Sequence, residues 1–158
     1  MGKRVGEEVS PESFRSVMTI ADLERLRSLC FIPGEFGLIL ASSDDRIHVP
    51  PAGCIGVYEE AVKAGLHFFL HPFVKRVMER FSLSLAQVAS NSWRYIVGFV
   101  CLCRMIGIRP TMGLFWSCFV LKRHSSGGGW WYFLPRSQRK IMLGVLSLIH
   151  GWKGWFFL

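Results

Sequence analysis

The sequence predicts an α+β fold that is mostly α-helical, with a helical domain followed by a small C-terminal antiparallel β-sheet. Apolar residues recur at helical spacing up to about residue 119, and two short aromatic runs then flank a glycine-rich connection. The chain is 51% hydrophobic and 14% aromatic, which is enough apolar surface to offset the entropy of ordering. We therefore expect a flexible arm over residues 1–18 and a single domain over residues 19–158.

The first helix is expected where Thr19 or Asp22 can cap a run with apolar residues three apart. That run holds Ile20, Leu23, Leu26 and Leu29. Pro33-Gly34 ends the segment, and the turn-forming residues of 35–56 predict an irregular loop.

Further helices are predicted from capping residues and apolar faces. Gly65 and Gly107 are placed to end two of them, and Asn91 or Ser92 can cap the longest. The predicted helical segments are 57–64, 71–81, 84–88, 93–106 and 110–119.

Two strands, 119–123 and 130–134, are predicted on either side of Gly127-Gly128-Gly129. The aromatic run 155–158 could join them as a third strand. Because the chain ends on this apolar run, we expect it to be truncated, a fragment of a larger protein.

Charge is divided unevenly along the chain. All acidic residues lie at or before Glu79, so the first 79 residues carry a net charge of −2 and the remainder carries +10. Cations without nearby carboxylates face water, an acidic surface of the first half, or an external polyanion.

The five cysteines are an odd number in mostly apolar surroundings, which favours reduced thiols in an intracellular protein, nuclear or cytoplasmic. The apolar runs Tyr95–Cys103, Thr111–Leu121 and Ile141–Trp152 are shorter than the roughly 18–20 residues that cross a bilayer. We expect no membrane association.

Catalysis has weak candidates. Asp44-Asp45 lies in turn-forming sequence, and Glu59-Glu60 lies on a helix one turn before Lys63, so capping and a solvated ion pair explain both. Cys101 and Cys103 point to different sides of a helix, and His67 and His71 are separated by bulky apolar residues. We expect no enzyme activity, no catalytic residues, no metal site and no cofactor.

Basic and aromatic residues alternate around the predicted hairpin, a combination that can bind single-stranded nucleic acid through phosphate contacts and base stacking. Alternatively, the rings are core residues and the cations are solvated. The candidate nucleic-acid-binding residues are Lys122, Arg123, Trp130, Trp131, Arg136, Arg139 and Lys140.

Short motifs from Phe31 to Leu158 match a known family in order. They are Ile32–Phe36, Asp44–Ile47, Pro50–Gly53, Gly56–Ala61, Lys63–Leu66, Leu70–Phe73, Asn91–Tyr95, Lys122–His124, Gly129–Phe133 and Gly151–Lys153. Together they resemble the plant gypsy-type transposon domain, also labelled a gypsy-type transposase domain.

The resemblance implies a retroelement-derived protein and supplies no catalytic residues. Gly154 stands where relatives have a charged residue nearby, and relatives continue beyond Leu158, so a decayed or truncated copy is expected. Our leading hypothesis is a non-catalytic, Gag-like structural or interaction module that assembles with itself or a protein partner. Its contact surface would be exposed aromatic residues at 152–158. The alternative is a nucleic-acid-binding module.

Overall fold

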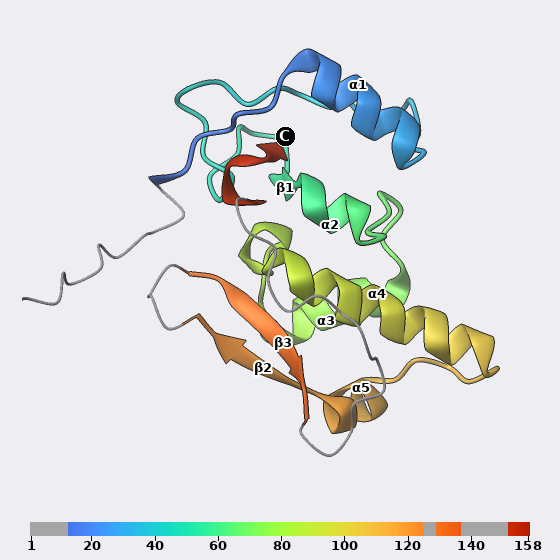
Figure 1. Cartoon of the computed structure of the whole chain (residues 1–158). Coiled ribbons are helices and arrows are strands. Elements are labelled where there is room, and N and C mark those ends of the chain that lie inside the picture. Colours follow the sequence, from blue (N-terminus) through green and yellow to red (C-terminus); the bar gives the residue numbers. More distant parts are fainter. Residues whose placement is uncertain (1–12, 125–128, 137–151) are drawn as a thin grey trace, which may run out of the picture.

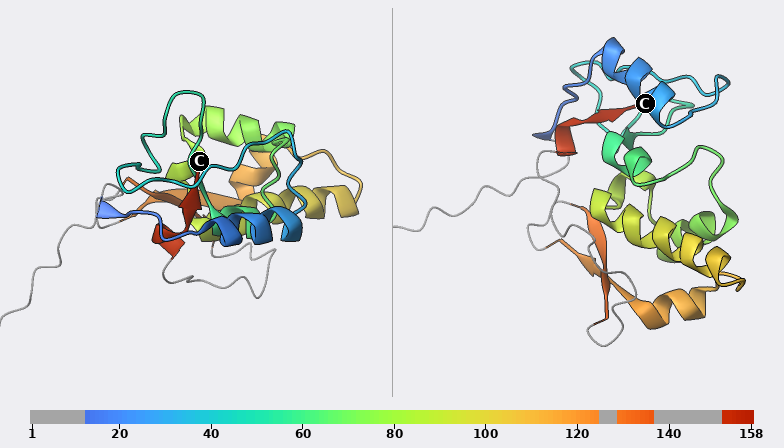
Figure 2. Two further views of the ribbon diagram at one scale, coloured as in Figure 1. Left: turned by 90° about the horizontal axis from the view of Figure 1, so that it is seen from above. Right: turned by 45° about the vertical axis from the view of Figure 1, so that its right-hand side comes forward.

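The computed structural model describes residues 13–124, 129–136 and 152–158. Helix α1 and the C-terminal residues lie at one end of the molecule, and a hairpin with helix α5 lies at the other (Figures 1 and 2). Helices α2, α3 and α4 lie between them. The predicted fold class, α+β and mostly helical with a small antiparallel sheet near the C-terminus, is confirmed.

Helix α1 (Ile20–Leu29) begins at the predicted cap. The Thr19 side chain accepts a hydrogen bond from the Asp22 N–H, and the Asp22 carboxylate accepts one from the Thr19 N–H. Leu23 and Leu26 are buried, whereas Ile20 and Leu29 are exposed. The helix lies at the edge of the molecule, so only the middle of its apolar stripe is covered.

Residues 30–56 form an irregular loop, which includes the loop predicted over 35–56. The helix predicted over residues 57–64 is shorter. Strand β1 (Val57–Tyr58) comes first, and helix α2 (Glu59–Lys63) follows it. Val57 and Tyr58 are extended because their backbone pairs with a distant strand, which local helical spacing does not reveal.

Helix α3 (Pro72–Phe81) begins at His71, whose Nδ1 accepts a hydrogen bond from the Phe73 N–H. It is followed by the short 3₁₀ turn η2 (Leu85–Gln87), also as predicted.

Helix α4 (Ser90–Met105) starts three residues before the predicted position, with Ala89 as its N-cap. The proposed caps Asn91 and Ser92 are therefore wrong. The Ser92 hydroxyl instead accepts a hydrogen bond from the Phe133 N–H, 2.8 Å away, and so ties the helix to the hairpin. Helix α5 (Met112–Cys118) is capped by Thr111 and begins two residues after the predicted start at 110.

Strands β2 (Phe119–Arg123) and β3 (Trp131–Pro135) form the predicted antiparallel hairpin, with Leu121 opposite Phe133. The prediction for the final aromatic run is wrong. Strand β4 (Phe156–Phe157) pairs with β1 and not with the hairpin, and Leu158 exchanges two backbone hydrogen bonds with Ile39.

The core is built around α4, whose Trp93, Ile96 and Phe99 are buried. Phe156, Phe157 and Leu158 are also buried, so the expected exposed aromatic surface at 152–158 is wrong. Pairing between β1 and β4 draws these rings inward. Part of the predicted arm is likewise packed: the Val17 N–H donates to the Gly154 carbonyl, and the Met18 side chain is buried.

Candidate interaction surface

The predicted nucleic-acid-binding residues are distributed along the hairpin. Lys122 and Arg123 are exposed near the end of β2. Lys122 lies opposite Tyr132 and Arg123 opposite Trp131. Because successive strand residues point to opposite faces, the two cations lie on different faces of the hairpin.

The structure does not place Trp130 on the surface. Its side chain is 1% exposed, and its indole N–H donates to the Tyr58 hydroxyl at 3.1 Å. With the Lys153 ammonium over its ring, Trp130 is a buried residue whose face is not open to a nucleic-acid base in this structure. Trp131 is half-buried.

Arg136 follows the other end of β3. Its guanidinium lies 5.5 Å from the centre of the Trp116 ring, and its Nε donates to the Trp116 carbonyl. Lys122, Arg123 and Arg136 therefore do not form one cluster. Arg139 and Lys140 lie outside the described residues.

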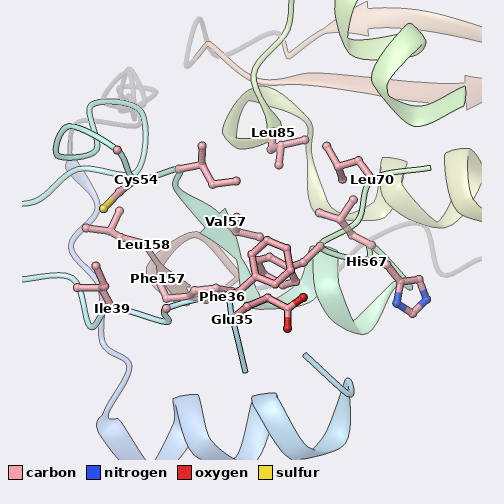
Figure 3. Close-up of a pocket in the computed structure, with 15 residues that line it drawn as sticks. Glu35, Phe36, Ile39, Cys54, Val57, His67, Leu70, Leu85, Phe157 and Leu158 are labelled. Atoms are coloured by element: carbon pink, nitrogen blue, oxygen red, sulfur yellow. The ribbon is translucent and has the colours of Figure 1, made fainter. Parts of the chain in front are cut away.

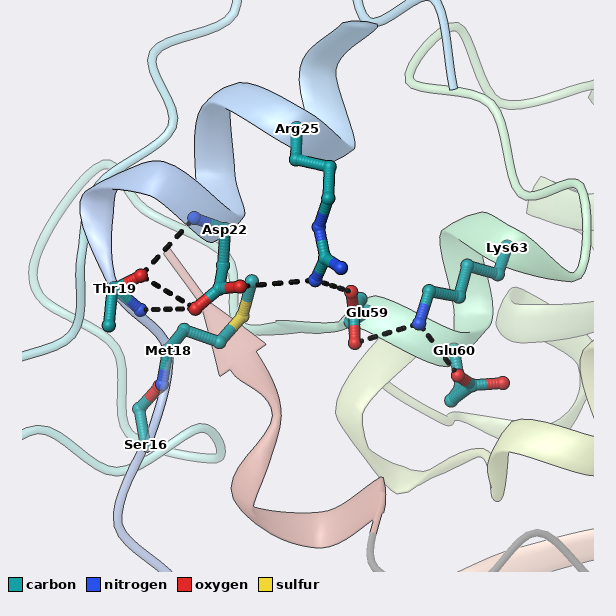
Figure 4. Close-up of polar contacts among 8 residues, drawn as sticks. All are labelled: Ser16, Met18, Thr19, Asp22, Arg25, Glu59, Glu60 and Lys63. Carbon is teal, nitrogen blue, oxygen red and sulfur yellow. Dashed lines mark hydrogen bonds and ion pairs between the residues drawn. The ribbon is translucent and has the colours of Figure 1, made fainter. Parts of the chain in front are cut away.

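The two acidic pairs make structural contacts. Asp45 accepts a hydrogen bond from the Ser42 N–H at 2.7 Å, and this bond lowers the pKa of the Asp45 carboxyl. Glu59 is buried between Lys63, 3.0 Å away, and Arg25 of α1, 3.6 Å away (Figure 4). The expected pairing of Glu59 with Lys63 is present, but the carboxylate is buried rather than solvated.

Lys63 forms ion pairs with both glutamates of α2. Burial lowers its pKa, but hydrogen bonds to Glu59 and Glu60 outweigh that effect, so the pKa of Lys63 is raised. Arg25 also pairs with Asp22 at 3.0 Å. This network joins α1 to α2. The contact between these helices could not be predicted from the sequence, because no local pattern relates residues 25 and 59.

An apolar hollow of about 440 Å³ lies among the loops near β1 and the C-terminal residues (Figure 3). Polar side chains around it include those of Glu35 and His67, which are exposed. Its apolar lining includes Phe36, Ile39, Ile55, Phe68, Leu70 and Phe157.

Several apolar side chains around this hollow remain open to solvent. Ile39 is 49% exposed and Ile55 is 56% exposed. Phe69, 67% exposed, packs its ring 5.1 Å from that of Phe36. Beside it a second, smaller hollow is lined by Phe69 and by Phe31, which is 88% exposed.

The two hollows share the lining residues Leu66, His67 and Phe68, so they are adjacent. We call the surface formed by residues 31–39, 53–57 and 66–70 the apolar loop surface. Sequence reasoning missed it because its aromatic residues have no helical or strand periodicity. Phe68-Phe69 and the nearby Phe31 and Phe36, set in turn-forming sequence, were the available signal.

Within residues 13–124, 129–136 and 152–158, no three His, Cys, Asp or Glu side chains gather closely enough to hold a metal ion. None of the helices in these ranges has the length and apolar character needed to cross a bilayer.

Residues 56–123 match the family model described as "Putative gypsy type transposon". This match runs from just before β1 to the end of β2, and over these residues it confirms the resemblance to a gypsy-type transposon domain. No curated protein and no solved structure gives a significant match to the chain.

Proposed function

We propose that this chain, which carries a gypsy-type transposon domain, is a non-catalytic, retrotransposon-derived (Gag-like) structural module that assembles with copies of itself. The observation that carries the proposal is the apolar loop surface, where exposed rings and aliphatic side chains surround a hollow of about 440 Å³. Contiguous apolar surfaces of this kind are typical of protein contacts.

The exposed side chains provide the driving force for association. Full burial of a single Phe or Ile side chain contributes about 1.5–3 kcal/mol. Phe31, Phe69 and Ile55 are each more than half exposed, so together they can offset much of the entropic cost of association.

A structural role also agrees with how the acidic residues are used. Glu59 and Glu60 bind Lys63, and Asp45 closes a turn at Ser42. General acid–base catalysis needs carboxylates that can reach a substrate. These carboxylates stabilise the fold instead.

The test is sedimentation of the purified chain over a range of concentrations, with Phe69→Ser and Ile55→Ser as variants. Met105→Ser is the matched control, because Met105 is 80% exposed at the end of α4, away from these loops. We expect the wild type and the control to associate, and the two surface variants to associate at least about tenfold more weakly. A wild-type chain that stays monomeric at about 1 mM would contradict self-assembly.

The alternative, nucleic-acid binding, is favoured by one observation. The ion pairs shown between described residues join Asp22, Arg25, Glu59, Glu60 and Lys63, all in the first half. The exposed Lys122 and Arg123 belong to the half that has ten cations and no carboxylates. Such cations can bind phosphates.

This alternative is tested by fluorescence anisotropy with single-stranded RNA and DNA across a salt series. If it holds, changing both Lys122 and Arg123 to Ala reduces the slope of log affinity against log salt by about 1–2. Changing the exposed Lys75 and Arg76 of α3 to Ala is the control, with a smaller expected effect. Absence of binding at low salt would exclude this function.

A further inference from the structure

The ammonium group of Lys153 lies among three aromatic rings that come from separate segments. Lys153 belongs to the turn η3 (Trp152–Gly154). Its Nζ lies 4.2 Å from the ring centre of Trp130, 5.2 Å from that of Phe14 and 6.0 Å from that of Trp152. All three distances are within the range of cation–π attraction.

The rings are steeply inclined to one another, so they form the walls of a cage. Phe14 and Trp130 meet at 63°, and Trp130 and Trp152 meet at 74°. Tyr58 fixes two walls: it accepts the hydrogen bond from the Trp130 indole and packs edge-on against Trp152, 4.5 Å away. The cage is thus oriented by the core rather than by Lys153.

We propose that Phe14, Trp130 and Trp152 form a binding site for the ammonium group of a lysine side chain, that Lys153 occupies it within the chain, and that an N-methylated lysine of another polypeptide is the ligand that competes for it. The alkylammonium group of Lys153 already lies against the three rings, so the site accommodates a group of this chemistry.

Methylation favours binding for a physical reason. Burial lowers the pKa of Lys153, because the cage removes water from an ammonium group that prefers hydration. A trimethylated ammonium keeps its charge at every pH, is more weakly hydrated and needs no hydrogen-bond acceptor. Ring faces therefore bind it better than they bind an unmodified lysine.

We expect the cage to retain its walls when the Lys153 side chain is removed. The Val17 N–H donates to the Gly154 carbonyl at 2.8 Å, and the Ser16 hydroxyl donates to the Phe156 carbonyl at 2.6 Å. These bonds hold the segment that carries Phe14 beside the turn that carries Trp152. Neither involves the Lys153 side chain.

The first test measures binding of Nα-acetyl-Nε-trimethyllysine amide to the full chain with Lys153→Ala, followed by tryptophan fluorescence. We expect it to bind about tenfold more tightly than its uncharged carbon isostere, and more tightly than it binds the wild type, where Lys153 competes. Adding Phe14→Leu, which removes one half-buried wall, should weaken binding severalfold. Equal affinity for the charged and uncharged probes would overturn the proposal.

A second test uses the wild-type fold, in case Lys153→Ala does not fold. Reductive methylation with ¹³C-formaldehyde labels every lysine, and the resonance absent from Lys153→Arg identifies dimethylated Lys153. Inside the cage its methyl signals are displaced upfield by the ring currents of the three walls. Methyl signals at the position of those of the exposed Lys75 and Lys122 would show that the cage rejects a methylated ammonium and would overturn the proposal.

Discussion

The two small sheets of this protein are built in opposite ways. Strands β2 and β3 are neighbours in sequence, and the side chains on one face of their hairpin, such as Lys122 and Tyr132, are exposed or half-buried. Strands β1 and β4 lie 100 residues apart, and all four of their side chains are buried. The local sheet follows from turn chemistry, whereas the long-range sheet depends on packing, so substitutions should affect the two differently.

The largest expected difference is in the free energy of unfolding that is lost when a buried side chain of one sheet, or a half-buried side chain of the other, is shortened to Ala. Phe157 in β4 is 1% exposed and packs beside Phe68, so Phe157→Ala should lower the free energy of unfolding by about 3–5 kcal/mol. Leu134 in β3 is half-buried opposite Val120, so Leu134→Ala should cost about 1 kcal/mol. Urea unfolding measures both, and equal losses would contradict the comparison.

A glycine shortly before one strand of each sheet provides a second contrast in stability. A Cβ at Gly56 would lie 2.1 Å from the Ile47 carbonyl oxygen, and backbone cannot move aside cheaply, so Gly56→Ala should cost about 3 kcal/mol. Gly129 has φ of +73°, where a side chain is strained by about 1–2 kcal/mol, and Gly129→Ala should cost that amount. Thermal and urea unfolding give both values. A larger loss at Gly129 would mean that the hairpin connection, not the long-range sheet, limits stability.

Tyr58 links the two sheets, because it lies in β1 and accepts the hydrogen bond from Trp130 just before β3. Burial raises its pKa to about 12. Between pH 10 and 12 the unfolded chain loses this proton while the folded chain keeps it, so stability falls as pH rises. The loss should reach about 2–3 kcal/mol at pH 12.

Tyr58→Phe tests this pH dependence. The variant is less stable at neutral pH, because the Trp130 indole loses its acceptor, but its unfolding free energy should decline less between pH 10 and 12. Tyr95→Phe is the control: burial also raises the pKa of Tyr95, yet the variant keeps Tyr58 and should retain most of the decline. An unchanged slope in Tyr58→Phe would mean that another group titrates.

Prediction from sequence succeeded where the determining residues are local. Thr19 with Asp22, His71 with Pro72, and the strands around the glycine run form the expected elements. Prediction failed where a segment distant in the sequence determines the local conformation or the hydrogen-bond partner. Val57 and Tyr58 begin the segment predicted to be a helix, but they pair with β4. Ser92 was predicted to cap a helix, but its hydroxyl accepts a hydrogen bond from the Phe133 N–H.

The candidate surface shows the same limit. Composition identified excess aromatic residues, but not which of them would stay exposed. Trp130 and Phe157 are covered by residues far away in the sequence, whereas Phe31 and Phe69 lie in loops that are not covered. Exposure depends on the whole fold and cannot be predicted from composition. The packing of β4 therefore overturns the contact surface predicted at 152–158.

The smallest expected effect distinguishes two adjacent glutamates at the start of α2, directly after β1 (Figure 4). Glu59 is 4% exposed and shared by Arg25 and Lys63, so Glu59→Gln leaves both cations short of a buried partner and should cost about 2 kcal/mol. Glu60 binds Lys63 nearer the surface, so Glu60→Gln should cost about 0.5 kcal/mol or less.

Repeating the urea unfolding of both variants in 1 M NaCl sharpens the contrast, because salt screens exposed pairs more than buried ones. The cost at Glu59 should largely remain and that at Glu60 should disappear. If salt removed both costs equally, Glu59 would behave as a surface charge. The ion pairs between α1 and α2 would then not stabilise the packing of these two helices.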